Sequence, residues 1–215
     1  MSSPRRSARP SKLEATPRRL PLSGRFSMWQ ALGAPEGIEV LTWNSSALLS
    51  PTAKLRKRKG DFISRVGRTA DILCLQEVRP AAGSAPRLLL KLFPTKVAFV
   101  SVHPVSGTGG VVTMVSARLA AKCAIGVSEL IPGRALRLSL EAGGFKLIVW
   151  NIHNFGFLLR EFEKLARRVQ KDLKEHELNP NRVLVCVIGD MNYMSEGDTR
   201  CKAIDVASTS NDRRS

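Results

Sequence analysis

The sequence has few acidic residues and few aromatic ones, and no long run of apolar residues. Asp and Glu number 18 against 34 Lys and Arg, which gives a formal net charge of +16, and aromatic residues make up 6% of the chain. This excess of positive charge attracts polyanions such as nucleic acid or anionic lipid, although it can also serve solubility alone. No apolar stretch approaches the roughly 20 residues that a membrane-spanning helix needs, and the N-terminus lacks the apolar core of a secretion signal. The composition predicts an intracellular protein without a membrane partner.

The cysteines are too dispersed to form a zinc site. The chain has four, none in a Cys-x-x-Cys pair or a Cys/His cluster of zinc spacing: Cys74, Cys123, Cys186 and Cys201. Cys74 and Cys186 lie within apolar runs, where a free cysteine behaves as a small buried hydrophobic residue. This usage favours a reducing compartment, and we expect a nuclear or cytoplasmic location.

Residues 1–34 are rich in Ser, Pro and Arg and contain a single acid, Glu14. A segment of this composition cannot build a core, and it predicts a disordered basic arm. A mitochondrial presequence has a similar composition, but Pro4, Pro10, Pro17 and Pro21 would interrupt the amphipathic helix of such a signal. Mitochondrial import is therefore the less favoured alternative.

From about residue 37 the chain alternates short apolar runs with turns. The runs predict strands at Ile38–Trp43, Asp71–Leu75, Val97–Val102, Val111–Ser116, Ala135–Leu140, Lys146–Trp150 and Val183–Ile188. Apolar residues at spacings of three and four predict an amphipathic helix over Phe157–Leu178, and weaker patterns predict helices over Ala53–Arg68 and Pro86–Leu92. Strands joined both by turns and by helices indicate a layered α/β domain with a β-sandwich at its centre, over residues 37–195, followed by a polar tail at 196–215.

Polar side chains of the kinds used in metal-assisted phosphoryl chemistry follow four of these strands. They are Asn44, Glu77, the pair Asn151 and His153, and the pair Asp190 and Asn192. Rigid strands can deliver such groups to one rim of a sandwich. A hard cation such as Mg²⁺ takes oxygen ligands from one or two carboxylates and leaves positions for water and phosphate. Each residue alone is an ordinary turn residue, so the prediction depends on their joint occurrence.

This ordered set of motifs resembles the endonuclease/exonuclease/phosphatase superfamily over roughly residues 37–195. Within it, the sequence is similar to the apurinic/apyrimidinic-endonuclease-like nucleases that non-LTR retrotransposons encode. The motifs are Trp43-Asn44, Leu75-Gln76-Glu77-Val78, Thr108-Gly109-Gly110-Val111, Asn151-Ile152-His153 and Gly189-Asp190-Met191-Asn192. The resemblance implies a four-layered α/β sandwich and Mg²⁺- or Mn²⁺-dependent hydrolysis of phosphodiester bonds, with DNA as the expected partner.

The resemblance also implies roles for individual residues. Asn44 and Glu77 would bind the metal, and Asp190 would orient and activate the attacking water. Asn192 would hold Asp190 or a phosphate oxygen. His153 falls where some members place a histidine general acid and others a tyrosine, so it is either a general acid or a neutral hydrogen-bonding residue.

Three basic residues are candidates for binding the substrate. Arg134 either binds phosphate through both guanidinium branches or caps a turn. Lys57 and Arg58 belong to a dense basic run on the first predicted helix, which either contacts a phosphate backbone or forms a solvated face. Asn151, which opens the Asn-x-His motif, belongs to the expected catalytic set.

Members of the superfamily finish with an Asp-containing strand and a Ser-Asp-His segment, and neither follows Asn192 in this sequence. We therefore expect a domain that is incomplete at its C-terminal end and exposes an unpaired sheet edge. A truncated reading frame and a diverged remnant that binds without catalysis both explain this pattern, so the activity of the chain stays open. The shared motifs also allow a phosphatase or phosphodiesterase acting on RNA, lipid or inositol phosphate, and they leave the oligomeric state undetermined.

Overall fold

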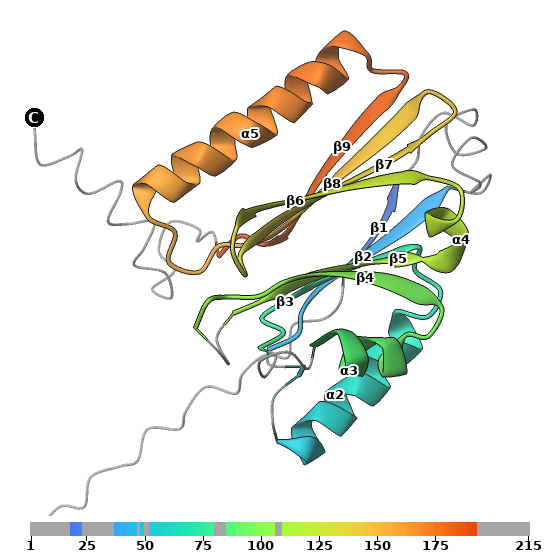
Figure 1. Ribbon diagram of the computed structural model, residues 1–215, viewed down its shortest axis with the longest axis vertical. Coiled ribbons are helices and arrows are strands. Elements are labelled where there is room, and N and C mark those ends of the chain that lie inside the picture. Colours follow the sequence, from blue (N-terminus) through green and yellow to red (C-terminus); the bar gives the residue numbers. More distant parts are fainter. Residues whose placement is uncertain are drawn as a thin grey trace, which may run out of the picture.

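Two β-sheets pack face to face, and helices cover their outer faces (Figure 1). The computed structural model describes residues 18–22, 37–46, 48–49, 52–79, 85–105 and 109–192. In the described part the first sheet has the strand order β1-β2-β3-β5-β4 and the second the order β6-β7-β8-β9. The layers run helix, sheet, sheet, helix, which confirms the predicted four-layered α/β sandwich.

The elements have the following bounds in chain order. They are β1 (Arg18–Leu22), β2 (Ile38–Asn44), α2 (Ala53–Val66), β3 (Ile72–Gln76), α3 (Ala85–Leu92), β4 (Lys96–Ser101), β5 (Val111–Ser116), α4 (Ala117–Ala120), β6 (Ala124–Ile131), β7 (Ala135–Ala142), β8 (Phe145–His153), α5 (Leu159–Leu178) and β9 (Val183–Asp190).

The buried apolar residues form three clusters, one between each pair of neighbouring layers. Strand alternation produces this division, since successive side chains point to opposite faces. In β8, Leu147 and Val149 face the first sheet, whereas Ile148 and Trp150 face α5. In the first sheet, Leu73 of β3 packs toward α2 and α3. Both faces of the central strands β3 and β8 are thus covered.

A buried ion pair attaches α5 to the second sheet. Asp172 of α5 is 2% exposed. It accepts hydrogen bonds from Arg137 Nε at 2.8 Å and Nη2 at 3.0 Å, and from Trp150 Nε1 at 2.9 Å. A charge pair buried with this many hydrogen bonds fixes the position of the helix along the sheet.

Two strands were not predicted. β6 is an edge strand whose side chains are mostly exposed, so it lacks a clear apolar alternation. β1 pairs antiparallel with β2 within the segment expected to be a disordered arm, so that expectation differs from the structure at Arg18–Leu22. Pro21 is compatible with a strand at the sheet edge, where a missing N–H breaks no ladder. The remainder of residues 1–34 and the predicted tail at 196–215 lie outside the described residues.

The second sheet ends at β9, and no described strand pairs with the outer edge of β9. In the described part of the chain, no helix combines the length and the apolar character needed to cross a membrane.

Candidate active site

The site lies where two pairs of parallel strands end. β2 and β3 are parallel, with Asn44 opposite Gln76, and β8 and β9 are parallel, with His153 opposite Asp190. The carboxyl ends of the two pairs meet across the sandwich. The hydrogen bond from Asn44 in the first sheet to Asp190 in the second shows this. The strand ends therefore deliver four of the predicted polar residues to one rim: Asn44, Glu77, His153 and Asp190.

Three ionisable side chains converge at this rim. One ligand atom from each of Glu77, His153 and Asp190 lies within 4.8 Å of the other two. The amide nitrogen of Asn44 lies between the carboxylates and donates to Glu77 Oε1 at 3.1 Å and to Asp190 Oδ2 at 2.6 Å. The amide oxygen of Asn44 accepts from the Ser46 N–H at 3.0 Å. Asn44 thus presents its nitrogen to the cluster, whereas the expected metal ligation would use its oxygen.

Glu77 is held in its ionised form. Its contact with His153 is the largest influence that lowers its pKa, and hydrogen bonding from Asn44 and the charge of Arg79 add to it. Burial opposes these contacts, yet the pKa of Glu77 still falls to about 2. Arg79 forms an ion pair with Glu77 Oε2 at 2.9 Å. Glu77 therefore carries a full negative charge at neutral pH.

His153 is buried, at 1% exposure, and its two ring nitrogens make no hydrogen bond to the described residues. Nε2 lies 3.4 Å from Glu77 Oε1, an ion-pair distance, but neither ring nitrogen finds a partner in hydrogen-bond geometry among the described residues. A buried polar atom without a partner is costly and is usually satisfied by water or a ligand. Two carboxylates beside such an imidazole form a donor set that fits a divalent cation.

The segment after β9 orients Asp190. The backbone N–H of Asn192 donates to Asp190 Oδ1 at 3.0 Å. The side-chain amide of Asn192 donates to the Asn154 carbonyl at 2.6 Å, and Asn154 donates to the Met191 carbonyl at 2.8 Å. Asn192 therefore contacts Asp190 through its backbone, and its side chain ties the ends of β8 and β9 together.

Asn151 does not reach the rim. It shares a strand face with His153 but lies two residues deeper and is fully buried. Its Oδ1 accepts from Gln76 Nε2 at 2.7 Å, and its Nδ2 donates to the Val112 carbonyl at 2.9 Å. The structure thus places Asn151 between the sheets, beneath the cluster, and its expected catalytic role is not supported by this position.

Arg134 holds a loop, which matches the turn-capping alternative. It forms an ion pair with Glu161 at 2.6 Å and donates to the carbonyls of Phe155 at 3.3 Å and Gly156 at 3.1 Å. Its guanidinium also lies over the ring of Phe157, 5.2 Å from the centroid. Through these contacts, Arg134 binds the segment between β8 and α5.

Lys57 and Arg58 are exposed on α2, and Lys57 pairs with Asp61 one turn along the helix at 2.9 Å. Their role in substrate binding stays a prediction. Two residues at the site were not singled out from the sequence: Arg79 and Phe155. Each follows a predicted site residue within two positions, and that proximity is the only signal the sequence offers for them.

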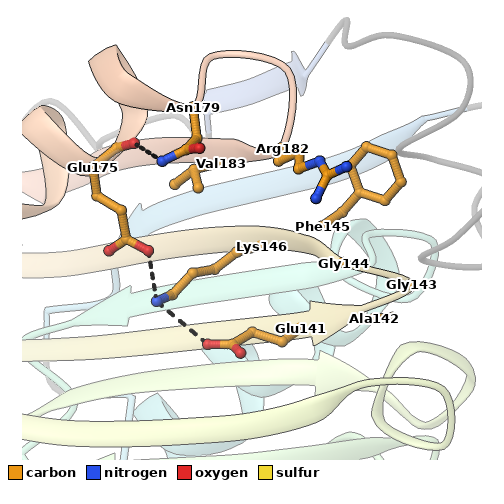
Figure 2. A pocket seen from close by; sticks show the side chains of 10 residues that line it. All are labelled: Glu141, Ala142, Gly143, Gly144, Phe145, Lys146, Glu175, Asn179, Arg182 and Val183. Atoms are coloured by element: carbon orange, nitrogen blue, oxygen red, sulfur yellow. Dashed lines mark hydrogen bonds and ion pairs between the residues drawn. The ribbon is translucent and has the colours of Figure 1, made fainter.

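A pocket of about 470 Å³, called the distal pocket below, lies at the opposite end of the second sheet, and Figure 2 shows the residues that line it. Phe145 and Val183, which line it, begin β8 and β9, whereas His153 and Asp190 end these strands. The Lys146 ammonium is paired with Glu175 at 2.9 Å and with Glu141 at 3.4 Å, and the contact with Glu175 raises the pKa of Lys146. The positive charge of Lys146 is thus neutralised by two acids that line the same pocket. The candidate functional site is therefore the rim cluster of Glu77, His153 and Asp190.

The fold and the rim cluster together define a sandwich with a candidate metal centre at the ends of its strands. Residues 41–204 match the family model of the Endonuclease/Exonuclease/phosphatase family, and the chain belongs to this family. A comparison with curated protein sequences gives no match.

Solved structures with the same fold include TDP2 from C. elegans, with a TM-score of 0.51 and 22% sequence identity over 75% of this chain and 49% of that one. Truncated TDP2 from the same organism gives a TM-score of 0.50 and 22% identity over 75% of this chain and 64% of that one. This chain thus spans about half the length of the first of these structures. At this identity the likeness shows the fold.

Proposed function

We propose that this protein is a divalent-metal-dependent phosphodiesterase that acts on nucleic acid, with DNA cleavage as its reaction. The observation that carries the proposal is the convergence of Glu77, His153 and Asp190, whose ligand atoms lie within 4.8 Å of one another. Membership of the Endonuclease/Exonuclease/phosphatase family supports it. The net charge of +16 favours a polyanionic substrate over a small phosphate ester.

The residues at the rim can divide the chemistry among them. Glu77, ionised at neutral pH, and Asp190 would hold the cation together with His153. When bound, a divalent cation neutralises charge on the phosphoryl oxygens. Asp190 accepts hydrogen bonds on both carboxylate oxygens, from Asn44 and Asn192, so its direction is fixed. A fixed carboxylate of this kind can orient the attacking water and accept its proton.

His153 has a second possible role in the same reaction. Its ring nitrogens have no hydrogen-bond partner among the described residues. One of them is therefore free to donate a proton or a hydrogen bond to the leaving oxygen while Glu77 contacts the ring at 3.4 Å. The finer assignment, an endonuclease of the type that non-LTR retrotransposons encode, depends on the Asn-x-His and Gly-Asp-x-Asn motifs and is part of this proposal.

The test is nicking of a supercoiled plasmid in Mg²⁺, Mn²⁺ and EDTA. We expect cleavage in metal, none in EDTA, and at least about a hundredfold loss of rate in Asp190→Asn. Glu175→Gln removes an acid in the distal pocket and should cleave as the wild type does. Cleavage that survives both EDTA and Asp190→Asn would contradict the proposal.

The net charge of +16 also supports a second candidate function, a binding module without catalysis. Such a module would bind DNA equally well in EDTA and in Mg²⁺, with a steep dependence on salt, and would not cleave in any metal. The nicking assay combined with a binding titration at two salt concentrations separates the two functions.

A further inference from the structure

An exposed phenylalanine lies directly against the candidate active site. Phe155 is 70% exposed, which means that it contributes little to any core. Its ring stacks on the ring of His153, with centroids 5.9 Å apart and planes inclined by 11°. Aromatic rings at this separation attract each other in an offset stack. One side of Phe155 is thus fixed against the cluster, while most of the side chain is open to solvent.

Hydrogen bonds on both sides hold the backbone of Phe155. Its N–H donates to the His153 carbonyl at 2.9 Å, and its carbonyl accepts from Arg134 at 3.3 Å. Arg134 is itself anchored by Glu161 at 2.6 Å. The preceding residue, Asn154, is bonded to the end of β9. An aromatic ring on a fixed backbone loses little conformational entropy when a ligand packs on it.

We propose that Phe155 is a base-stacking residue that selects nucleic acid with an unstacked nucleotide beside the scissile phosphate. The inference rests on the proposed function. Aromatic side chains bind bases of any identity by stacking, since every base has a π-face. In an intact duplex the neighbouring base pairs cover these faces, so only a single-stranded, mismatched or extruded nucleotide offers one.

The position of Phe155 sets which phosphate is cut. Because its ring contacts His153, a base stacked on it brings the adjoining phosphate next to His153, and therefore toward Glu77 and Asp190. Stacking thus links substrate choice to placement of the reacting group. In the distal pocket, by contrast, the Lys146 ammonium is already paired with Glu141 and Glu175.

A general apolar docking surface is the competing explanation for the exposed ring. Leu159, at 68% exposure, opens α5 four residues further along the chain. A protein or lipid partner bound by apolar contact would use Leu159 as well as Phe155. A stacked base would use Phe155 but not Leu159, because stacking requires the flat face of an aromatic ring. Leu159 is therefore the matched control.

The experiment measures binding in EDTA, so that it does not depend on cleavage. A short single-stranded oligodeoxynucleotide carrying one 2-aminopurine, and the same strand in a duplex, are titrated with the complete chain. The proteins are the wild type and the variants Phe155→Leu, Phe155→Tyr and Leu159→Ala. We expect Phe155→Leu to weaken single-strand binding about fivefold or more and to abolish quenching of 2-aminopurine. Phe155→Tyr should retain both, and Leu159→Ala should match the wild type.

Each alternative outcome has a defined meaning. Equal losses on single strand and duplex, no loss in Phe155→Leu, or an equal loss in Leu159→Ala would overturn the inference, as would failure of the wild type to bind the single strand. A ring that only shields His153 would change the rate of cleavage without changing binding or fluorescence. Failure of the proposed function is seen separately, as absence of metal-dependent nicking by a wild type that binds and quenches normally.

Discussion

The side-chain amides of Gln76 and Asn151 hydrogen-bond to each other across the two sheets, with Gln76 Nε2 lying 2.7 Å from Asn151 Oδ1. Gln76 also donates to Thr42 Oγ1 at 3.1 Å, and Asn151 to the Val112 carbonyl at 2.9 Å. Both amides are buried. This polar contact lies directly beneath the rim cluster and joins the strands that carry Glu77 and His153.

Asn151→Ala should therefore destabilise the fold rather than disable the chemistry directly. The substitution removes the inter-sheet acceptor of the buried Gln76 Nε2 and the donor to the Val112 carbonyl, and losing these buried hydrogen bonds costs about 1–3 kcal/mol in the free energy of unfolding. Urea denaturation followed by circular dichroism measures this. The exposed Asn181, changed to Ala, is the control and should alter stability by less than about 0.5 kcal/mol. Unchanged stability in Asn151→Ala together with lost activity would instead indicate direct contact with the substrate.

Asp172 offers a test of how α5 is attached. Asp172→Ala leaves the buried guanidinium of Arg137 without its counter-charge, and the expected cost is about 3–5 kcal/mol in the free energy of unfolding. The comparison is Asp61→Ala, which breaks the Lys57–Asp61 pair at the surface and should leave stability nearly unchanged, because exposed pairs contribute little. Similar denaturation midpoints for the two variants would contradict the buried position of the Asp172 pair.

The cysteines give a prediction about the order in which their thiols react at pH 8. Burial raises the pKa of Cys186 to about 11 and that of Cys74 further, while Cys123 is partly exposed and its pKa is raised less strongly. A raised pKa lowers the thiolate population at pH 8, and burial blocks access. In a Cys201→Ser background, a thiol reagent at pH 8 should modify Cys123 first, and Cys74 and Cys186 only after denaturation. Rapid native modification of Cys74 would mean that the inter-sheet core is open.

Sequence patterns predicted most of the fold because strand alternation and helix periodicity are local signals. β3 and β8 are recognisable from their apolar runs, and α5 from its spacing of three and four. β6 was missed because an exposed edge strand has no buried face to generate a pattern. The strand-end motifs also located Glu77, His153 and Asp190 at one rim.

The sequence could not settle which way each polar group points. Asn151 and His153 have equivalent spacing along β8, yet one is covered by Gln76 and the other reaches the cluster. Whether Asn44 presents its oxygen or its nitrogen depends on the Ser46 N–H and on two carboxylates far away in the chain. The partner of Arg134 is likewise a long-range choice, made when α5 packs on the sheet. These outcomes follow from tertiary contacts that no local pattern encodes.

The most direct test of the central claim is a Mn²⁺ titration of the complete chain, with free ion followed by electron paramagnetic resonance. If Glu77, His153 and Asp190 hold the cation, the wild type binds Mn²⁺, and Glu77→Gln and Asp190→Asn each weaken binding by at least about tenfold. Glu175→Gln, an equal change of charge in the distal pocket, should bind as the wild type does. Equal Mn²⁺ affinity in the wild type, Glu77→Gln and Asp190→Asn would contradict a metal centre at this rim.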